Sequence, residues 1–237
     1  MDVQDAIIRD TRAYLQDKRL LGFPYEPKNC AVQRKESQVI LLKETACELG
    51  GRGKKSAAYT CISSTPGIVG ESGTYLYGPD VGSINSPLSY ARITFVETED
   101  IGEEDEAYHA CKDIELLKYG VYPEGFMIRA SAMDEREQVR VSKQAVREGL
   151  SFEKIGNLFI RKYLEHPRVK AVQVLFLTGD DVDYDRLSQY ARKNKMIVKA
   201  LNKIMEKADA QCGTCNLKEI CDEVEGLRKM HFQNRKR

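Results

Sequence analysis

Three cysteines near the C-terminal end of the sequence have side chains and spacing suited to a metal site. Cys212, Cys215 and Cys221 form a C-x2-C-x5-C pattern. A C-x2-C pair places two thiols on one tight turn, where both can bind the same metal. Cys221 falls in the first turn of an expected helix, where the helix dipole favours a thiolate. The pattern therefore predicts a site for zinc or an iron–sulfur cluster.

Both kinds of site need four ligands, so one ligand must come from elsewhere. Cys47 and Cys61 are the first candidates, and the others are Cys30, Cys111 and, for zinc, His231. An alternative interpretation is that Cys221 is a core residue and the C-x2-C pair holds no metal. The four upstream cysteines are dispersed, which argues against a disulfide framework and leaves metal or redox chemistry for the C-terminal group.

A second candidate site is the segment "ELGGRGKKS" (48–56), which joins two expected strands. Its glycines could expose backbone amides to an anion, and Arg52, Lys54 and Lys55 could pair with phosphates. The segment is not a Walker A loop, because Lys55 stands where that motif needs Ser or Thr. The alternative is a solvated hairpin that carries positive charge at its tip.

The elements that would position these residues follow from hydrophobic periodicity and from Gly, Pro and Ser boundaries. Helices are expected over 2–19, 103–120, 142–149, 151–165, 183–208 and 216–231, and strands over 38–43, 57–63, 73–78, 90–97, 125–131 and 169–178. This order predicts an α+β fold: a mixed sheet with flanking helices, an N-terminal helix and a C-terminal helical extension that carries the cysteines.

The expected helices and strands divide the chain into three parts. Residues 1–25 form an N-terminal helix and linker, 26–182 an α+β domain, and 183–237 the helical extension. The strand over 169–178, "VKAVQVLFLT", is almost continuously apolar. Such a run predicts a central strand that is covered on both faces.

Composition excludes some classes of protein. Lys and Arg number 37 against 36 Asp and Glu, which gives a formal net charge of +1. Neither nucleic-acid binding nor an anionic membrane is indicated, because both favour a basic surface. No apolar run approaches the roughly 20 residues of a membrane helix, and the N-terminal residues have no secretory core. The expected location is the cytoplasm.

Four segments together resemble a known family. They are "ELGGRGKKS" (48–56), "YGPDV" (77–81), "VRVSKQAVREGLSFEKIG" (139–156) and "VQVLFLT" (172–178). In order and spacing they resemble the acetyl-CoA synthase β subunit of the carbon monoxide dehydrogenase/acetyl-CoA synthase, or acetyl-CoA decarbonylase/synthase, complex. The resemblance covers about residues 30–185 and matches the domain before the catalytic one. It implies that domain's α+β fold and a role in anaerobic C1 and acetyl-CoA metabolism.

The resemblance also bears on the cysteines. The family's cluster segment begins with a C-x2-C pair and a third cysteine, as Cys212, Cys215 and Cys221 do here with a shorter second spacing. The C-x2-C-x5-C spacing also resembles part of the auxiliary sites of some radical enzymes, which favours iron–sulfur over zinc. The family binds a second nickel through a C-x-C pair that this sequence lacks.

The expected function is therefore an iron–sulfur-binding subunit or accessory protein of such a complex, with protein partners and without catalysis by this chain alone. Two alternatives stay open. One is a non-catalytic module that binds coenzyme A or a protein, with the cysteines zinc-bound or idle. The other is one half of a split acetyl-CoA synthase, whose catalytic domain is a separate chain.

Overall fold

The computed structural model describes residues 3–100, 104–131, 135–205, 215–224 and 227. Its larger sheet has five strands in the order β1 (Leu21–Pro24), β4 (Gly73–Tyr77), β8 (Val169–Leu177), β5 (Tyr90–Thr98) and β3 (Ser56–Ser63). β4 and β8 are parallel, as are β5 and β3, whereas β1–β4 and β8–β5 are antiparallel. The sheet is therefore mixed, as the sequence predicts.

β8 occupies the centre of this sheet, and its side chains alternate between two hydrophobic clusters. Ala171, Leu175 and Leu177 face one cluster, while Val172 and Phe176 face the other. This alternation is the period of two that every strand has. The expectation of a central strand covered on both faces is confirmed.

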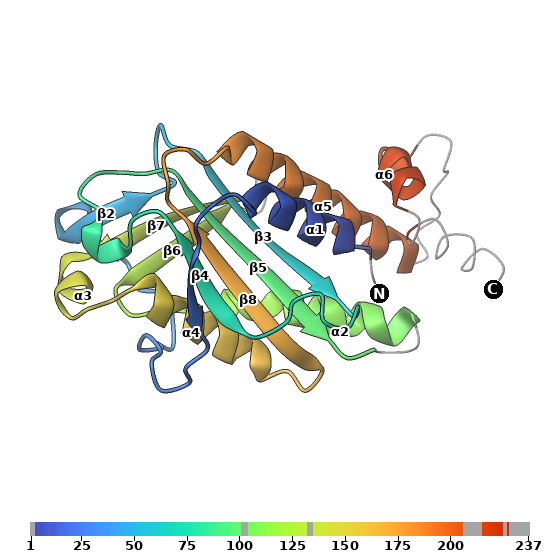
Figure 1. The fold of residues 1–237 in the computed structure, drawn as a ribbon, viewed down its shortest axis with the longest axis horizontal. Helices are drawn as coiled ribbons and strands as arrows, with labels where there is room; N and C mark the ends of the chain where they lie inside the picture. The colour runs from blue at the N-terminus through green and yellow to red at the C-terminus, as the bar shows by residue number, and fades with distance from the viewer. Residues whose placement is uncertain (1–2, 101–103, 132–134, 206–214, 225–226, 228–237) are drawn as a thin grey trace.

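Helices cover the two faces of the sheet (Figure 1). On one face, α1 (Asp5–Leu15) and α5 (Tyr184–Met205) contribute Ile7, Ile8 and Leu187 to the first cluster. On the other face, α4 (Phe152–Leu164) buries Phe152, Ile155 and other apolar residues in the second. Ser151 caps α4 by accepting a hydrogen bond from the Lys154 amide at 3.2 Å.

A second, antiparallel sheet has the order β2 (Thr45–Leu49), β7 (Arg136–Ser142) and β6 (Phe126–Ser131). Between β5 and β6 the chain forms α2 (Glu104–Leu116) and a 3-10 turn, η3 (Leu117–Gly120), and α3 (Lys143–Arg147) follows β7. The apolar side chains of this sheet join the cluster beneath α4. Besides β5, the helix α5 and the strand β7 of the second sheet pack against β3.

The prediction of a strand over residues 38–43 is wrong. Residues 38–41 have no regular structure, Leu42–Glu44 form the 3-10 turn η1, and pairing begins only at Thr45. Only Ile40 of this run is buried, whereas Val39, Leu41 and Leu42 are at least half exposed, so the run does not pack in a sheet. The strands β1, β2 and β7 were not expected from the sequence.

The C-terminal part of the described chain packs on α5. The helix α6 (Lys218–Glu223) contributes Ile220 to the first cluster, beside Leu217 and Leu227. Of the helix expected over 216–231, the structure describes Lys218–Glu223 as α6 and Leu227 as helical. Leu177, Val182 and Leu187 lie in one cluster, and the expected domain boundary at residue 182 stays a prediction.

The fold class is α+β, with a mixed sheet, flanking helices and an N-terminal helix. Among the residues that the structure describes, no helix has the length and apolar character needed to cross a membrane.

Candidate functional site

The cysteine segment lies at one end of the molecule, beside the last turns of α5. Cys212 is outside the described residues, whereas Cys215 and Cys221 are half-buried against the cluster under α5. The Lys203 ammonium lies 4.0 Å from the Cys215 sulfur and 3.4 Å from the Asn216 side-chain oxygen. Both described thiols are thus partly accessible, and one of them faces a positive charge.

The two favoured candidates for a fourth ligand lie elsewhere. Cys61 is fully buried in β3, with its sulfur 3.7 Å from the Asn194 side-chain oxygen. Cys47 lies in β2, in the other cluster and at the opposite end of the molecule from α6 (Figure 1). Burial raises the pKa of Cys47 to about 11 and raises the pKa of Cys61 further, which disfavours the thiolate that a metal needs.

The remaining candidates are Cys30, Cys111 and His231. Cys30 is half-buried and donates to the Pro27 carbonyl at 3.4 Å. Burial raises the pKa of Cys111 to about 11. His231 is outside the described residues. Within the described ranges, no three His, Cys, Asp or Glu side chains are grouped as metal ligands. The fourth ligand therefore stays a prediction.

The glycine turn between β2 and β3 forms one side of a shallow concavity of about 560 Å³. Gly50 and Gly53 have positive φ angles of 62° and 74°, which let the chain reverse here. Exposed arginines from three segments line the concavity: Arg52 from the turn, Arg129 from β6 and Arg136 from β7. No carboxylate belongs to its described lining, so this surface suits an anion.

The three cations that the sequence singled out in this turn are only partly brought together. Arg52 lines the concavity. Lys54 is exposed and outside the lining, and Lys55 forms an ion pair with Asp185 at the start of α5. Arg129 and Arg136 were missed, because they belong to strands that are distant in sequence from the turn.

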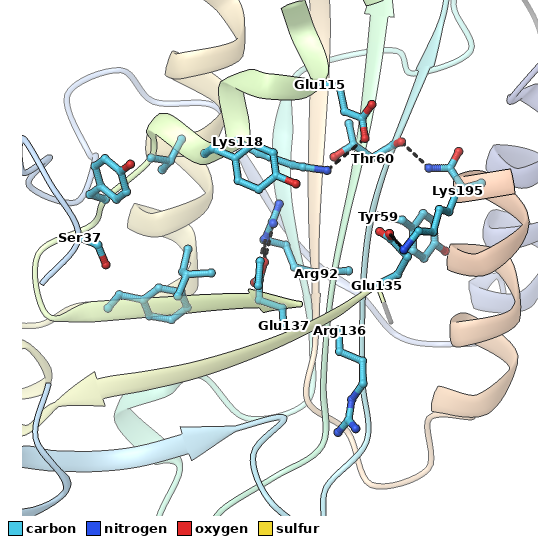
Figure 2. A pocket seen from close by; sticks show the side chains of 18 of the residues that line it. Ser37, Tyr59, Thr60, Arg92, Glu115, Lys118, Glu135, Arg136, Glu137 and Lys195 are labelled. Carbon is cyan, nitrogen blue, oxygen red and sulfur yellow. Dashed lines mark hydrogen bonds and ion pairs between the residues drawn. The ribbon is translucent and has the colours of Figure 1, made fainter. Parts of the chain in front are cut away.

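A deeper cavity of about 550 Å³ lies at the outer edge of β3, between α5, η3 and the second sheet (Figure 2). Its wall mixes charged and apolar side chains. Among the charged residues are Arg92, Glu137, Glu115, Lys118, Glu135, Lys195 and Lys199, and among the apolar ones are Val121, Phe126, Ile128 and Val198.

A buried ion pair forms part of this wall. The Arg92 side chain, 5% exposed, donates from Nε to Glu137 Oε1 at 3.0 Å and from Nη2 to Oε2 at 2.6 Å. Glu137 is 1% exposed and also accepts from the Tyr90 hydroxyl at 3.3 Å. Burial alone would lower the pKa of Arg92, but Glu137 outweighs it and raises that pKa. The Arg92 guanidinium therefore stays charged, and both carboxylate oxygens of Glu137 accept hydrogen bonds from it.

Two further cations reach the cavity. The Lys118 side chain in η3 is 13% exposed, and its ammonium lies 3.3 Å from Glu115. Burial acts to lower the pKa of Lys118, whereas Glu115 and Tyr163 raise it, and the net shift is upward. Lys195 pairs with Glu135 at 3.0 Å. Glu135 has a φ of 49°, uncommon for a residue with a side chain, and its carbonyl accepts from the Ala58 amide.

Sequence reasoning missed this cavity. The signal that could have found it is Arg92, a charge near the start of the strand-like run "YARITFVE". A buried charge needs a partner, but nothing in the sequence identifies Glu137, 45 positions away, as that partner.

No protein-family model matches the chain, and a search of the curated proteins finds no significant match. The resemblance to the acetyl-CoA synthase β subunit stays a prediction from the sequence segments that carry it.

Proposed function

We propose that this chain is an iron–sulfur-binding subunit or accessory protein related to carbon monoxide dehydrogenase/acetyl-CoA synthase, and that it is not catalytic alone. The observation that carries the proposal is the accessibility of its clustered thiols. Cys215 and Cys221 are half-buried, whereas Cys47 and Cys61 are buried in strands. The resemblance of four sequence segments to the family supplies the metabolic context.

The donor set fits a cluster by its chemistry. Cys212, Cys215 and Cys221 would hold it, and three thiols within ten residues suit a soft metal. When bound, such a cluster supplies one-electron transfer at a potential set by its surroundings. The Lys203 ammonium, 4.0 Å from the Cys215 sulfur, would stabilise negative charge on that ligand.

The proposal assigns the acetyl-forming chemistry to a partner chain. The family's second nickel needs a C-x-C pair, and this sequence has none. A separate polypeptide with that pair would make the present chain one half of a split enzyme. Affinity purification of the tagged chain from its native host under anaerobic conditions tests this. Recovery of a nickel-containing partner is expected, and recovery of the chain alone at native expression level contradicts it.

Iron and sulfide content provide the direct test of the cluster. Anaerobically prepared protein is expected to contain about four iron and four sulfide per chain, as a cubane does. Each of Cys212→Ser, Cys215→Ser and Cys221→Ser should remove at least half of the iron and the visible absorption. Cys30→Ser and Cys111→Ser, at half-buried cysteines far from the segment in sequence, test the fourth ligand: a variant that keeps the parent iron content excludes its cysteine from the cluster.

Two results would contradict the cluster. A colourless protein that contains zinc, lost in the same three variants, would assign the segment to zinc. If the protein contains no bound metal and the three variants have the same melting temperature as the parent, the cysteines bind no metal.

A second candidate function is favoured by the arginine-lined concavity. The chain would act as a non-catalytic module that binds coenzyme A through its phosphates. Arg52, Arg129 and Arg136 converge there beside glycine backbone, and arginine pairs with phosphate through two parallel hydrogen bonds. This candidate does not require the cysteines to hold a metal.

Titration calorimetry with coenzyme A tests the second candidate. The double variant Arg52→Gln/Arg129→Gln is expected to bind at least tenfold more weakly, and raised salt should weaken the parent as well. Arg147→Gln, which changes an exposed arginine on α3, is the matched control and should bind as the parent does. Pantetheine, which lacks the phosphates, should give no heat. Equal binding of pantetheine would reject the assignment.

A further inference from the structure

β3 is the outermost strand of the larger sheet, and side chains and backbone from other elements close its free edge. The Ala58 amide donates to the Glu135 carbonyl at 2.9 Å, and the Ile62 amide donates to the Gln4 side chain at 2.7 Å. Alternate residues of a strand present their backbone groups to the same edge. The Thr60 amide, between these two, therefore faces the same edge, where Thr60 lines the cavity.

The charged lining of the cavity has an excess of cations. Five cationic and three carboxylate side chains line it, which leaves two positive charges in excess. The carboxylates of Glu137 and Glu135 are occupied by Arg92 and Lys195, at 2.6 and 3.0 Å. Lys199 has no carboxylate partner among the described residues. An anion in the cavity would therefore meet cations that the protein does not fully neutralise.

Lys118 is the cation best placed to receive such an anion. Figure 2 shows its side chain extending from η3 across the cavity toward Thr60. One carboxylate, Glu115, accepts from its ammonium at 3.3 Å, although an ammonium has three N–H donors. Since the Lys118 side chain is 13% exposed, little water is available to those donors. A charged acceptor would gain more from this ammonium than from one on the open surface.

Another part of the cavity lining is apolar. Val121 follows η3, and Phe126 and Ile128 lie on β6. Val121 and Phe126 are buried members of the cluster beneath α4, so this wall is held in place by the core. A volume of about 550 Å³ lies within the range of sites that hold a small organic molecule.

We propose that this cavity binds a small organic anion, with its carboxylate or phosphate on Lys118 and the Thr60 amide and its apolar body against Val121, Phe126 and Ile128. This site is separate from the cysteine segment, and it shares Ala130 and Arg136 with the lining of the arginine-lined concavity. Arg92 and Glu137 are positioning residues: their mutual ion pair fixes β5 against β7 beside the site.

Three aromatic probes separate the features of this ligand. Benzoate, phenyl phosphate and neutral benzamide share a ring, and benzamide has the shape of benzoate without its charge. Titration of ¹⁵N-labelled protein, followed by amide chemical shifts, is expected to show saturable shifts at Thr60 for an anion and none for benzamide. The anion that binds more tightly identifies the head group.

Substitutions of Lys118 and of Glu115 are expected to change the affinity for the anion in opposite directions. Lys118→Gln should weaken binding of the preferred anion at least tenfold. Glu115→Gln should strengthen it severalfold, because it removes a competing carboxylate. Lys162→Gln is the matched control: Lys162 also pairs with a carboxylate three residues away, Glu165 at 2.6 Å, but does not line the cavity. Lys162→Gln should bind the preferred anion with the same affinity as the parent.

The opposite sign expected for Glu115→Gln keeps the test valid even if Lys118→Gln perturbs the fold. Equal binding of benzamide, an unchanged affinity in both variants, or the absence of Thr60 shifts with either anion would overturn the proposal.

Discussion

The substitution Glu137→Ala is expected to lower the free energy of unfolding by about 3 to 5 kcal/mol, because it leaves a buried guanidinium without its counter-charge. Arg92 is 5% exposed and gives both Nε and Nη2 to this carboxylate. The Phe159 ring, whose centroid lies 4.4 Å from the guanidinium carbon, contributes to its environment but carries no charge. Urea denaturation followed by circular dichroism measures the loss.

Removing both charges together should restore most of that stability. In Arg92→Met/Glu137→Leu, apolar side chains of similar size replace the pair, and such replacements of a buried pair are often neutral or stabilising. The matched control is Glu124→Ala, which breaks the exposed pair of Arg34 and Glu124 at 2.8 Å. It should cost no more than about 1 kcal/mol, as surface pairs do. A loss that small in Glu137→Ala would contradict the assignment of an uncompensated charge.

Gly78→Ala is expected to destabilise the protein by about 2 to 5 kcal/mol, as the sum of backbone strain and overpacking. Gly78 follows β4, and its φ of 100° is reached easily only by glycine. An added Cβ would lie 2.7 Å from the Thr178 carbonyl carbon and closer still to the Gly179 amide nitrogen. Those backbone atoms directly follow β8, so they cannot move aside without disturbing the central strand.

Substitutions at two other glycines separate the cost of backbone strain from the cost of overpacking in Gly78→Ala. Gly53 has a φ of 74° with open space around its Cβ position, so Gly53→Ala should show the cost of strain without overpacking. Gly82 has open space and no positive φ, so Gly82→Ala should be close to neutral. Thermal unfolding of the three variants should rank Gly78→Ala as the least stable. Equal melting temperatures for Gly78→Ala and Gly53→Ala would show that the close backbone approach carries no cost.

The sequence predicts those parts of the fold in which hydrophobic pattern and burial agree. The strands expected over 57–63, 73–78, 90–97, 125–131 and 169–178 correspond to β3, β4, β5, β6 and β8 within a few residues. β7 was missed because its buried face includes Glu137, which interrupts the apolar alternation. The sequence does not predict β2, because the apolar run at residues 39–42, in which only Ile40 is buried, resembles a strand more closely than "TACEL" does.

The candidate sites were predictable only where their residues are adjacent in sequence. The cysteine spacing and the glycine turn are local patterns, and both were found. The arginine concavity and the cavity beside β3 arise from residues that the fold brings together from β3, η3, β7 and α5. Such sites depend on strand order and helix placement, neither of which periodicity specifies.

The central position of β8 also has a consequence for biosynthesis. β1 pairs with β4, and β3 pairs with β5, but β8 alone joins these two pairs into one sheet. Gly73 pairs with Gln173, and Ala91 pairs with Leu177, so the joining contacts span long loops that are slow to close. A nascent chain therefore holds two separate two-stranded ribbons, each marginally stable, until β8 has left the ribosome. Translation that stalls before residue 169 would release a chain that lacks both the strand that joins the two ribbons and the helix α5 that covers one face of the sheet.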